Sequence, residues 1–345
     1  MTRLMIIGEA WGEEEAKLGR PFIGTSGKFL RAMLRNVGID SDEAYMTNVF
    51  NLRPPNSNDV KNLCGNKIEG IQYSKFLLRG GQGYVKAQYA PEIERLWREI
   101  NVQDPNLILA LGNTAIWALL AGQNTISAVR GRITESIKHP LASRKYKVMP
   151  TFHPAAVLRA YTTRPIFAAD LFKARKDIDY PDIRWPQREI WIKPTLDDLD
   201  DFLREYIARQ NTPLSVDIET AYEQITEIGF APDPHHALVV PFISRENEDG
   251  NYWPTLENEL KAWQWVRQIL ATHPYIIGQN FVYDLKWLWH HYHLAIPGFK
   301  GDTMLMQHSQ QPEMEKSLGF LASIHSDEGV WKGMRKRNTT TKRED

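Results

Sequence analysis

The chain has 345 residues, of which 42% are hydrophobic, and its 42 lysine and arginine residues balance 42 aspartates and glutamates. This composition excludes a largely disordered chain, and the length favours two domains over one. The zero net charge excludes a global basic field, so any attraction to nucleic acid must come from local patches.

A single cysteine, Cys64, excludes an intramolecular disulfide framework and any metal or cluster site made only of cysteines. The opening stretch MTRLMIIGEAWGEEE has too short an apolar run for a signal peptide. No apolar run in the sequence is long enough to predict a membrane-spanning helix. We therefore expect a cytoplasmic protein with no membrane partner.

Three short apolar runs in the first half end at polar or glycine-bearing loops, and they lie at Leu4–Ile7, Leu107–Leu111 and Val148–Phe152. Helical patterns lie between them, at Lys28–Val37 and Pro91–Ile100. This alternation of buried strands with helices predicts a three-layer α/β/α sandwich, in which the loops after the strands gather at one edge of the sheet.

The stretch DYPDIRWPQ at 179–187 carries two prolines and mixed charge without periodicity, which is typical of a linker. We therefore predict one domain over 1–178 and a second over 188–345. The second domain begins with a helical pattern at Leu196–Ala208.

Three strand-like runs follow in the second half, at 214–220 (LSVDIET), Ile225–Ala231 and Ala237–Phe242. The last two predict an antiparallel pair and hence a mixed sheet. The segment Asn56–Tyr89 fits the pattern of neither half. Its GGQG at Gly80–Gly83 lacks the strand-turn-helix context of a phosphate loop, and it is predicted to be a surface turn.

Four segments of the first half stand out by their motifs. They are GEAWGEEEAKLGRPFIGTSG at 8–27, TNVFNLRPP at 47–55, LALGNTA at 109–115 and TFHPAAVLR at 151–159. In order and spacing they resemble uracil-DNA glycosylases of the family-4 type. The resemblance implies a glycosylase-like α/β/α domain that excises uracil from DNA.

The residue types in these segments suit that chemistry. An enzyme that breaks the bond between a base and its sugar must extract the base, read its edge and stabilise negative charge on the departing ring. Phe22 can stack on a pyrimidine face, and Asn48 offers the donor and acceptor that a uracil edge requires. His153 can donate to a carbonyl whose charge grows, while Glu9 and Glu15 can position water and balance a cationic sugar.

The resemblance assigns roles to several of these positions. It implies that Glu9 positions water, that His153 stabilises the leaving group and that the backbone of Ala10 lies beside the base. It also implies that the loop from Pro154 to Arg159 presses into the duplex where the base has left. The residues expected to contact DNA are Arg53 and Arg159.

Two departures from the family pattern occur. Trp11 stands where the family usually has proline, which alters the loop beside the proposed water site. Relatives commonly bind a structural iron-sulfur cluster through four cysteines, and a chain with one cysteine cannot do so. We therefore expect a glycosylase without a cofactor and without an iron-sulfur cluster.

Carboxylates mark a second constellation. Asp217 and Glu219 lie two apart on a predicted strand, so both side chains leave the same face and can bind a divalent metal together. Asn280 and Asp284 lie four apart on a predicted helix. These segments resemble the first and second motifs of DEDD-type 3′-to-5′ exonucleases, especially the proofreading domains of DNA polymerase I relatives. The resemblance implies a ribonuclease H-like domain with Mg²⁺ or Mn²⁺ at Asp217, Glu219 and Asp284.

The final motif of that exonuclease family, a tyrosine with an aspartate four residues on, is absent. Asp327 has Ser323 at that offset, and Asp302 matches a position that the family does not use for metal. We therefore expect an incomplete exonuclease site in a domain that is cut short.

Two other clusters have simpler interpretations. His290, His291 and His293 lack a converging ligand geometry and predict an exposed helix end. The basic run of Lys332, Arg335, Lys336 and Arg337 is typical of a solvated tail, with phosphate contact as the alternative.

Three functions remain open on the sequence. They are a uracil-excising enzyme whose second domain holds DNA, a bifunctional glycosylase and exonuclease, and a non-catalytic DNA-binding module. The presence of Glu9, Phe22, Asn48 and His153 and the missing exonuclease motif favour the first. We expect a monomer that acts on uracil in single- or double-stranded DNA, with a DNA polymerase as a further partner.

Overall fold

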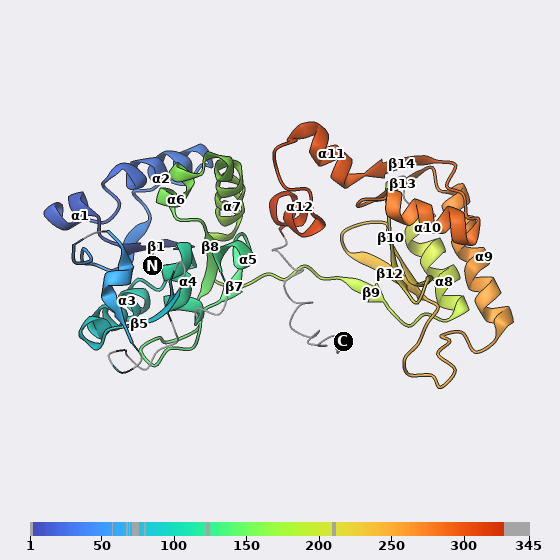
Figure 1. Cartoon of the computed structure of the whole chain (residues 1–345), viewed down its shortest axis with the longest axis horizontal. Coiled ribbons are helices and arrows are strands. Elements are labelled where there is room, and N and C mark those ends of the chain that lie inside the picture. Colours follow the sequence, from blue (N-terminus) through green and yellow to red (C-terminus); the bar gives the residue numbers. More distant parts are fainter. Residues whose placement is uncertain are drawn as a thin grey trace. The chain divides into compact units, whose positions relative to one another are not determined.

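The computed structural model describes residues 3–327, apart from 57, 67, 69, 71–75, 79–80, 122–124 and 209–211. The chain divides into two compact units. The first contains Met1–Ile183 together with the residues that follow Leu318, and the second contains Arg184–Leu318 (Figure 1).

The first unit is built on a sheet with strand order β2-β1-β6-β8-β7. The four long strands are parallel, and the short β7 pairs antiparallel with β8. The strands span Leu4–Ala10 (β1), Tyr45–Phe50 (β2), Leu107–Leu111 (β6), Thr134–Glu135 (β7) and Lys147–Thr151 (β8). Three of them, β1, β6 and β8, confirm the apolar runs seen in the sequence.

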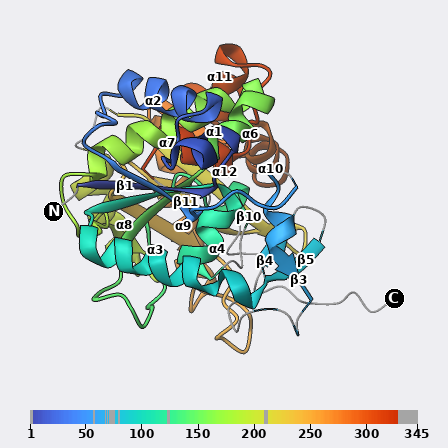
Figure 2. The same ribbon diagram turned by 90° about the vertical axis from the view of Figure 1, so that its left-hand side faces the viewer.

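Helices cover both faces of this sheet. Along β1 the side chains alternate, so Met5 and Ile7 join one core cluster while Leu4 and Ile6 join the other. Figure 2 shows α3 and α4 on one side of the strands and α2 and α7 on the other, which gives the expected three layers. The helices span Glu13–Leu18 (α1), Thr25–Asn36 (α2), Ala90–Gln103 (α3), Gly112–Leu120 (α4), Ile126–Val129 (α5), Pro154–Arg159 (α6) and Arg164–Asp177 (α7).

A small separate sheet lies within the segment that fitted neither pattern. Its order is β3-β5-β4, with strands Cys64–Gly65 (β3), Phe76–Leu78 (β4) and Gly81–Val85 (β5), and a 3-10 turn at Val60–Leu63 precedes it. The surface turn predicted at Gly80–Gly83 is wrong for the described residues 81–83, which belong to β5; Gly80 lies outside them. Pairing with strands on both sides overrides the local turn tendency of glycine.

The second unit holds a mixed sheet with order β14-β13-β10-β11-β12-β9. β10, β11 and β12 are antiparallel neighbours, and β13 and β14 continue parallel to β10. This is the strand order of the ribonuclease H-like fold expected from the sequence, with β9 added at one edge. The strands span Glu189–Trp191 (β9), Leu214–Ala221 (β10), Gln224–Ala231 (β11), His236–Pro241 (β12), Tyr275–Gly278 (β13) and Phe299–Asp302 (β14).

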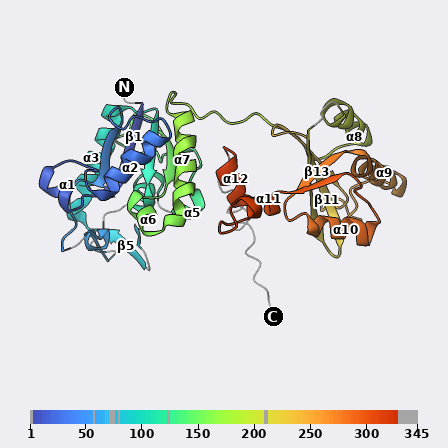
Figure 3. The ribbon, with the colours of Figure 1, turned by 90° about the horizontal axis from the view of Figure 1, so that it is seen from above.

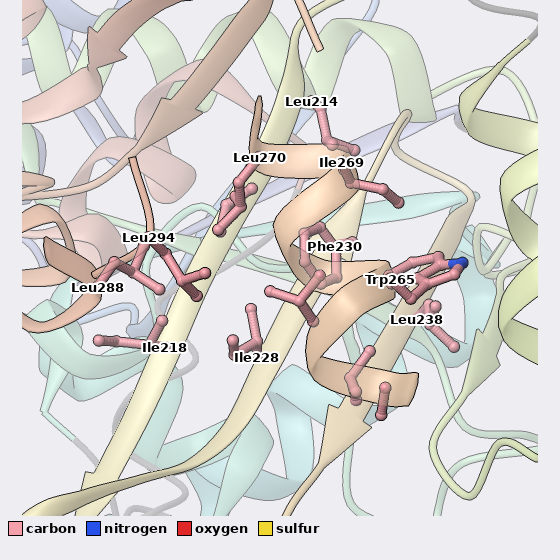
Figure 4. Packing of buried hydrophobic residues seen from close by; sticks show 14 of the residues in the cluster. Leu214, Ile218, Ile228, Phe230, Leu238, Trp265, Ile269, Leu270, Leu288 and Leu294 are labelled. Carbon is pink, nitrogen blue, oxygen red and sulfur yellow. The ribbon is translucent and has the colours of Figure 1, made fainter. Parts of the chain in front are cut away.

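Helices around the second sheet close one hydrophobic core. Figure 3 shows α8, α9 and α10 around these strands, and Figure 4 shows Trp265 and Ile269 of α9 lying over Ile228 and Phe230 of β11. The helices span Leu196–Phe202 (α8, continued by a π-helical turn at Leu203–Ile207), Leu256–Thr272 (α9), Val282–Tyr292 (α10) and Thr303–Gln310 (α11). None of the helices in the described part of the chain is long and apolar enough to cross a bilayer.

Helix α12 (Leu318–His325) groups with the first unit from Gly319 onward, whereas the sequence-based boundary assigned all of 188–345 to the second domain. The buried hydroxyl of Ser323 accepts a hydrogen bond from Arg130 at 2.9 Å, and the buried Lys173 donates to the Ser323 carbonyl at 2.9 Å. Arg130 also forms a buried ion pair with Asp170. This polar network joins α12 to the glycosylase-like unit.

Candidate active site

A cavity of about 630 Å³ opens in the first unit, among the segments that follow β1, β6 and β8. This volume lies in the range of ligand-binding pockets, about 300 to 1,000 Å³. Seven of the residues singled out in the sequence line it, namely Glu9, Ala10, Glu15, Phe22, Asn48, His153 and Arg159. Arg53 is not among the lining residues. All four motif segments of the first half, 8–27, 47–55, 109–115 and 151–159, thus contribute to one cavity.

Gly8 permits the close approach of the two proposed base-binding side chains. A Cβ atom on Gly8 would lie 2.3 Å from Asn48 Oδ1 and 2.5 Å from Phe22 Cζ. Gly8 and Asn48 are direct partners in the parallel pairing of β1 and β2. Phe22 and Asn48 are therefore packed against the same piece of backbone, and both are buried.

Phe22 is held in an unusual backbone conformation. Its φ of 55° lies in the left-handed region, which side chains of this size rarely adopt, and such strain concentrates at functional sites. Gly27, in the first turns of α2, sits so close that a Cβ there would lie 2.0 Å from the Phe22 carbonyl oxygen. Close packing of α2 therefore holds the Phe22 backbone in place.

His153 is a neutral hydrogen-bond donor in this site. Its Nδ1 caps α6 by accepting the backbone N–H of Ala155 at 3.2 Å, so the ring proton resides on Nε2. Burial, and then the nearby cation of Arg159, lowers the pKa of His153 to about 4. At neutral pH the imidazole is uncharged and can donate from Nε2.

Glu9 follows the buried part of β1 and is oriented by a residue that the sequence did not single out. The Thr114 hydroxyl, at the start of α4, donates a hydrogen bond to Glu9 Oε2. Burial is the main cause that raises the pKa of Glu9, and the Thr114 hydrogen bond acts against it. The position of Thr114 directly after the strand Leu107–Leu111 was the sequence signal for its role.

Glu15 ties two loops together. Its side chain is buried in α1, and its Oε1 accepts the backbone N–H of Gly24 at 3.1 Å. Its other oxygen lies against Gly12, where a Cβ would approach to 2.6 Å. Glu15 therefore connects the loop after β1 with the loop before α2.

The rim carries the expected cations in different settings. Arg159 is exposed at the end of α6 and lines the cavity. Arg53 is exposed as well but does not line the cavity. It pairs with Glu13 at 3.5 Å and donates to Asn58, a lining residue, at 3.1 Å. The expected loop from Pro154 to Arg159 is instead the helix α6, because the His153 cap and Pro154 start a helix there.

Of the carboxylates expected to bind metal in the second unit, Asp217 and Asp284 lie close enough for their charges to interact. Asp217 and Glu219 lie on the face of β10 opposite the buried Val216 and Ile218, as the alternation predicted. Asp284 is buried and accepts the Ile218 backbone N–H at 2.9 Å. Burial, with the negative charge of Asp217 nearby, raises the pKa of Asp284 to about 6.

Three expectations for the second unit are corrected or refined. Asn280 does not lie on the helix with Asp284, because α10 begins at Val282 and Asn280 has a left-handed φ of 55°. Asp302 accepts the backbone N–H groups of Asn280, Phe281 and Met304 at 3.1, 2.8 and 2.8 Å, which is a structural role. Over the part of the chain that the structure describes, no three His, Cys, Asp or Glu side chains converge as a metal-binding group.

The remaining expectations concern the histidine cluster, the basic run and the cysteine. His290 and His291 are exposed at the end of α10, where His291 stacks on Trp287. The basic run from Lys332 lies outside the described residues. Cys64, half-buried in β3, has its pKa raised to about 11 by burial, so this lone thiol does not fit the iron-sulfur cluster of family-4 relatives.

Comparison with known proteins identifies the family. The profile of the Uracil DNA glycosylase superfamily matches residues 1–177. A type-4 uracil-DNA glycosylase of Thermotoga maritima is 33% identical over 180 residues, covering 51% of this chain and 78% of that protein. One from Sulfurisphaera tokodaii is 31% identical, covering 51% and 70%. The chain belongs to the uracil-DNA glycosylase superfamily.

Other similarities extend into the second unit. A DNA polymerase of Bacillus phage SP01 is 23% identical over 326 residues, covering 83% of this chain and 30% of the polymerase. Brucella melitensis NrnC matches with 14% identity and a TM-score of 0.29, over 42% of this chain and 63% of that one. The EXD2 exonuclease domain soaked in Mn matches with 16% identity and a TM-score of 0.26, over 46% and 78%.

Proposed function

We propose that the first unit hydrolyses the bond between uracil and deoxyribose in DNA. The observation that carries this proposal is the state of His153, which is neutral and directs its donor nitrogen away from the helix that it caps. A base leaving as an anion needs a donor of this kind beside its carbonyl oxygen. The residues around His153 in the cavity supply the remaining requirements.

The base is recognised between Phe22 and Asn48. The substrate nucleotide rotates out of the DNA stack into the cavity, where the ring of Phe22 stacks on the uracil face. The amide of Asn48 pairs with the uracil edge, and cytosine presents the opposite donor and acceptor pattern at that edge. Because both side chains pack on Gly8, their spacing is fixed before the base arrives.

The bond breaks as negative charge moves onto the uracil ring. The Nε2–H of His153 donates to the carbonyl oxygen that receives this charge, and no proton has to be transferred from a cation. Glu9, oriented by Thr114, holds the attacking water and stabilises the positive charge that develops on the sugar. Glu15 holds together the loop after β1 and the loop before α2.

Release of free uracil tests this function. The 345-residue chain should release uracil from single- and double-stranded oligonucleotides in the presence of EDTA, because none of these groups needs a metal. Uracil is quantified by mass spectrometry against the abasic product. If no free uracil is detected when the enzyme is in excess over DNA, the proposal is refuted.

For the second unit we propose weak binding of Mg²⁺ or Mn²⁺ through Asp217, Glu219 and Asp284, with poor digestion of 3′ ends. The support is the proximity of Asp217 to Asp284, whose pKa is raised by burial and further by the negative charge of Asp217. Asp302 is committed to backbone N–H groups, so a full set of carboxylates is not assembled. The unit would then mainly hold DNA for the first unit.

We propose further that the protein is a cytoplasmic monomer that works beside a DNA polymerase. The similarity to a phage DNA polymerase over most of the chain supports a shared setting in DNA synthesis. Light scattering of the purified chain, followed by a test of its co-elution with a replicative DNA polymerase, tests both statements. A stable dimer or the absence of co-elution would refute the corresponding statement.

A further inference from the structure

One polar group in the cavity wall has no partner. The indole Nε1–H of Trp11 is buried, and no hydrogen bond to it exists among the described residues. Three other tryptophans, Trp97, Trp253 and Trp265, share this property, but all three lie in hydrophobic cores. Trp11 alone of the four lines the cavity, so its N–H can be satisfied by a bound molecule.

Three carboxylates of the cavity wall already accept hydrogen bonds from within the protein. Glu9 Oε2 accepts from Thr114, and Glu15 Oε1 accepts from the backbone of Gly24. Asp59 Oδ1 accepts the backbone N–H of Lys61 at the start of the 3-10 turn. Because an indole N–H donates and never accepts, any group of a bound molecule that pairs with Trp11 is an acceptor.

The position of Trp11 separates it from the residues that read the base. Its backbone N–H donates to the Leu52 carbonyl at 3.1 Å, beyond the end of β2, whereas Phe22 and Asn48 meet at Gly8 within the strands. The lining of the cavity also contains two exposed cations, Lys61 and Arg159. Donors and cations together suit the sugar-phosphate backbone.

We propose that Trp11 donates a hydrogen bond from its indole Nε1–H to a phosphate oxygen next to the flipped deoxyuridine. The inference rests on the proposed function, and it names a substrate contact that is independent of the base. A hydrogen bond to a charged acceptor is stronger than one between neutral groups. Trp11 thereby holds the phosphate of the flipped nucleotide in place. This contact contributes to kcat/KM but not to the selectivity for one base over another.

The test removes each partner of this bond separately. Oligonucleotides with one deoxyuridine carry a methylphosphonate at the phosphate on its 5′ side or its 3′ side, and kcat/KM is measured for wild type and Trp11→Phe. We expect Trp11→Phe to lose about tenfold on unmodified DNA, and one methylphosphonate to cost wild type about tenfold. With both changes present, the loss should stay near tenfold, because the bond is already absent.

Trp97→Phe is the matched control. It deletes the same indole N–H, also unpartnered, from a buried helix position outside the cavity lining. This variant should keep the kcat/KM of wild type and its sensitivity to methylphosphonate. Thermal unfolding of all three proteins confirms that each is folded at the assay temperature.

The possible outcomes separate this inference from the proposed function. Losses that multiply to about a hundredfold, or a Trp11→Phe variant equal to wild type, would overturn the role of Trp11 while uracil release by wild type stands. Should wild type release no uracil, the glycosylase function fails by itself. The same pairwise comparison is then made on the Kd for an oligonucleotide with an abasic-site analogue, where an absence of coupling refutes the phosphate contact.

Discussion

The carboxylates of two polar clusters, one after β1 and one beside β10, differ in their hydrogen-bond partners. In the first, Glu9 accepts a hydrogen bond from the Thr114 hydroxyl, which orients one carboxylate oxygen in the cavity wall. In the second, Asp284 and Asp302 are largely committed to backbone N–H groups. A carboxylate that a neighbouring side chain orients keeps an oxygen available to act on a substrate. A carboxylate that binds backbone N–H groups has its oxygens occupied by a structural role.

The largest effect on the first cluster is expected from His153→Ala. Removing one donor to a developing anion typically lowers kcat by about 100- to 1,000-fold. Single-turnover rates of uracil release measure the change. His139→Ala is the control, because His139 stacks on Trp97 outside the cavity lining. A loss of less than threefold in His153→Ala would show that the leaving group is stabilised elsewhere.

Asn48→Asp should change which base is excised. An aspartate cannot supply the N–H that a uracil carbonyl accepts, and it can accept from the amino group of cytosine. A mismatched buried pair costs about 1 to 3 kcal/mol, so the preference for uracil should fall by roughly 10- to 100-fold. Competition between uracil and cytosine substrates measures it. An unchanged preference would remove Asn48 as the reading residue.

Thr114→Val should shift the pH profile. Burial raises the pKa of Glu9 and the Thr114 hydroxyl lowers it, so loss of the hydroxyl raises that pKa further. Activity that requires ionised Glu9 is lost as pH falls through this pKa, so the acidic limb should move to higher pH. Thr114→Ser keeps the hydroxyl and should keep the wild-type limb. If the acidic limb of the pH profile lies at the same pH in wild type, Thr114→Val and Thr114→Ser, Thr114 does not position Glu9.

The smallest change is expected in the second cluster, where Asp284→Asn should stabilise the fold near neutral pH. The pKa of Asp284 is raised from 3.8 to about 6, so the folded state binds the proton more tightly than the unfolded chain. Stability therefore falls as pH rises from about 4 to about 6. The variant should remove this decline and gain roughly 1 to 3 kcal/mol at pH 7.5. Urea unfolding at pH 4 and 7.5 measures it, and a destabilised variant at pH 7.5 would contradict the argument.

The sequence could predict the parts of this site that depend on strands and their ends. Glu9 and His153 follow buried apolar runs, and parallel strands bring such positions to one edge. It could not predict the left-handed backbone of Phe22, because tight packing against Gly27 imposes it. The sequence spacing predicted Asn280 on the same helix as Asp284. A turn before α10 breaks this spacing, and such a turn is also set by packing rather than by the pattern of residues.

The longest-range error concerned α12. The contact between Arg130 and Ser323 joins residues 193 positions apart, and no local periodicity encodes such a pairing. A strand or helix is specified by its own residues and their spacing, whereas the side on which a terminal helix packs depends on a surface formed elsewhere. Domain boundaries drawn from a linker alone therefore miss a segment that returns to an earlier domain.

The network around Ser323 also sets an order of events during synthesis. Lys173 leaves the ribosome 150 residues before its partner Ser323, which at 5 to 20 residues per second is about 8 to 30 s. For that interval the buried Lys173 has the Gly131 carbonyl at 3.4 Å as an acceptor but not yet that of Ser323, while the second unit is already emerging. The first unit therefore gains its contact with Ser323 only after residues 184–318 of the second unit have been made.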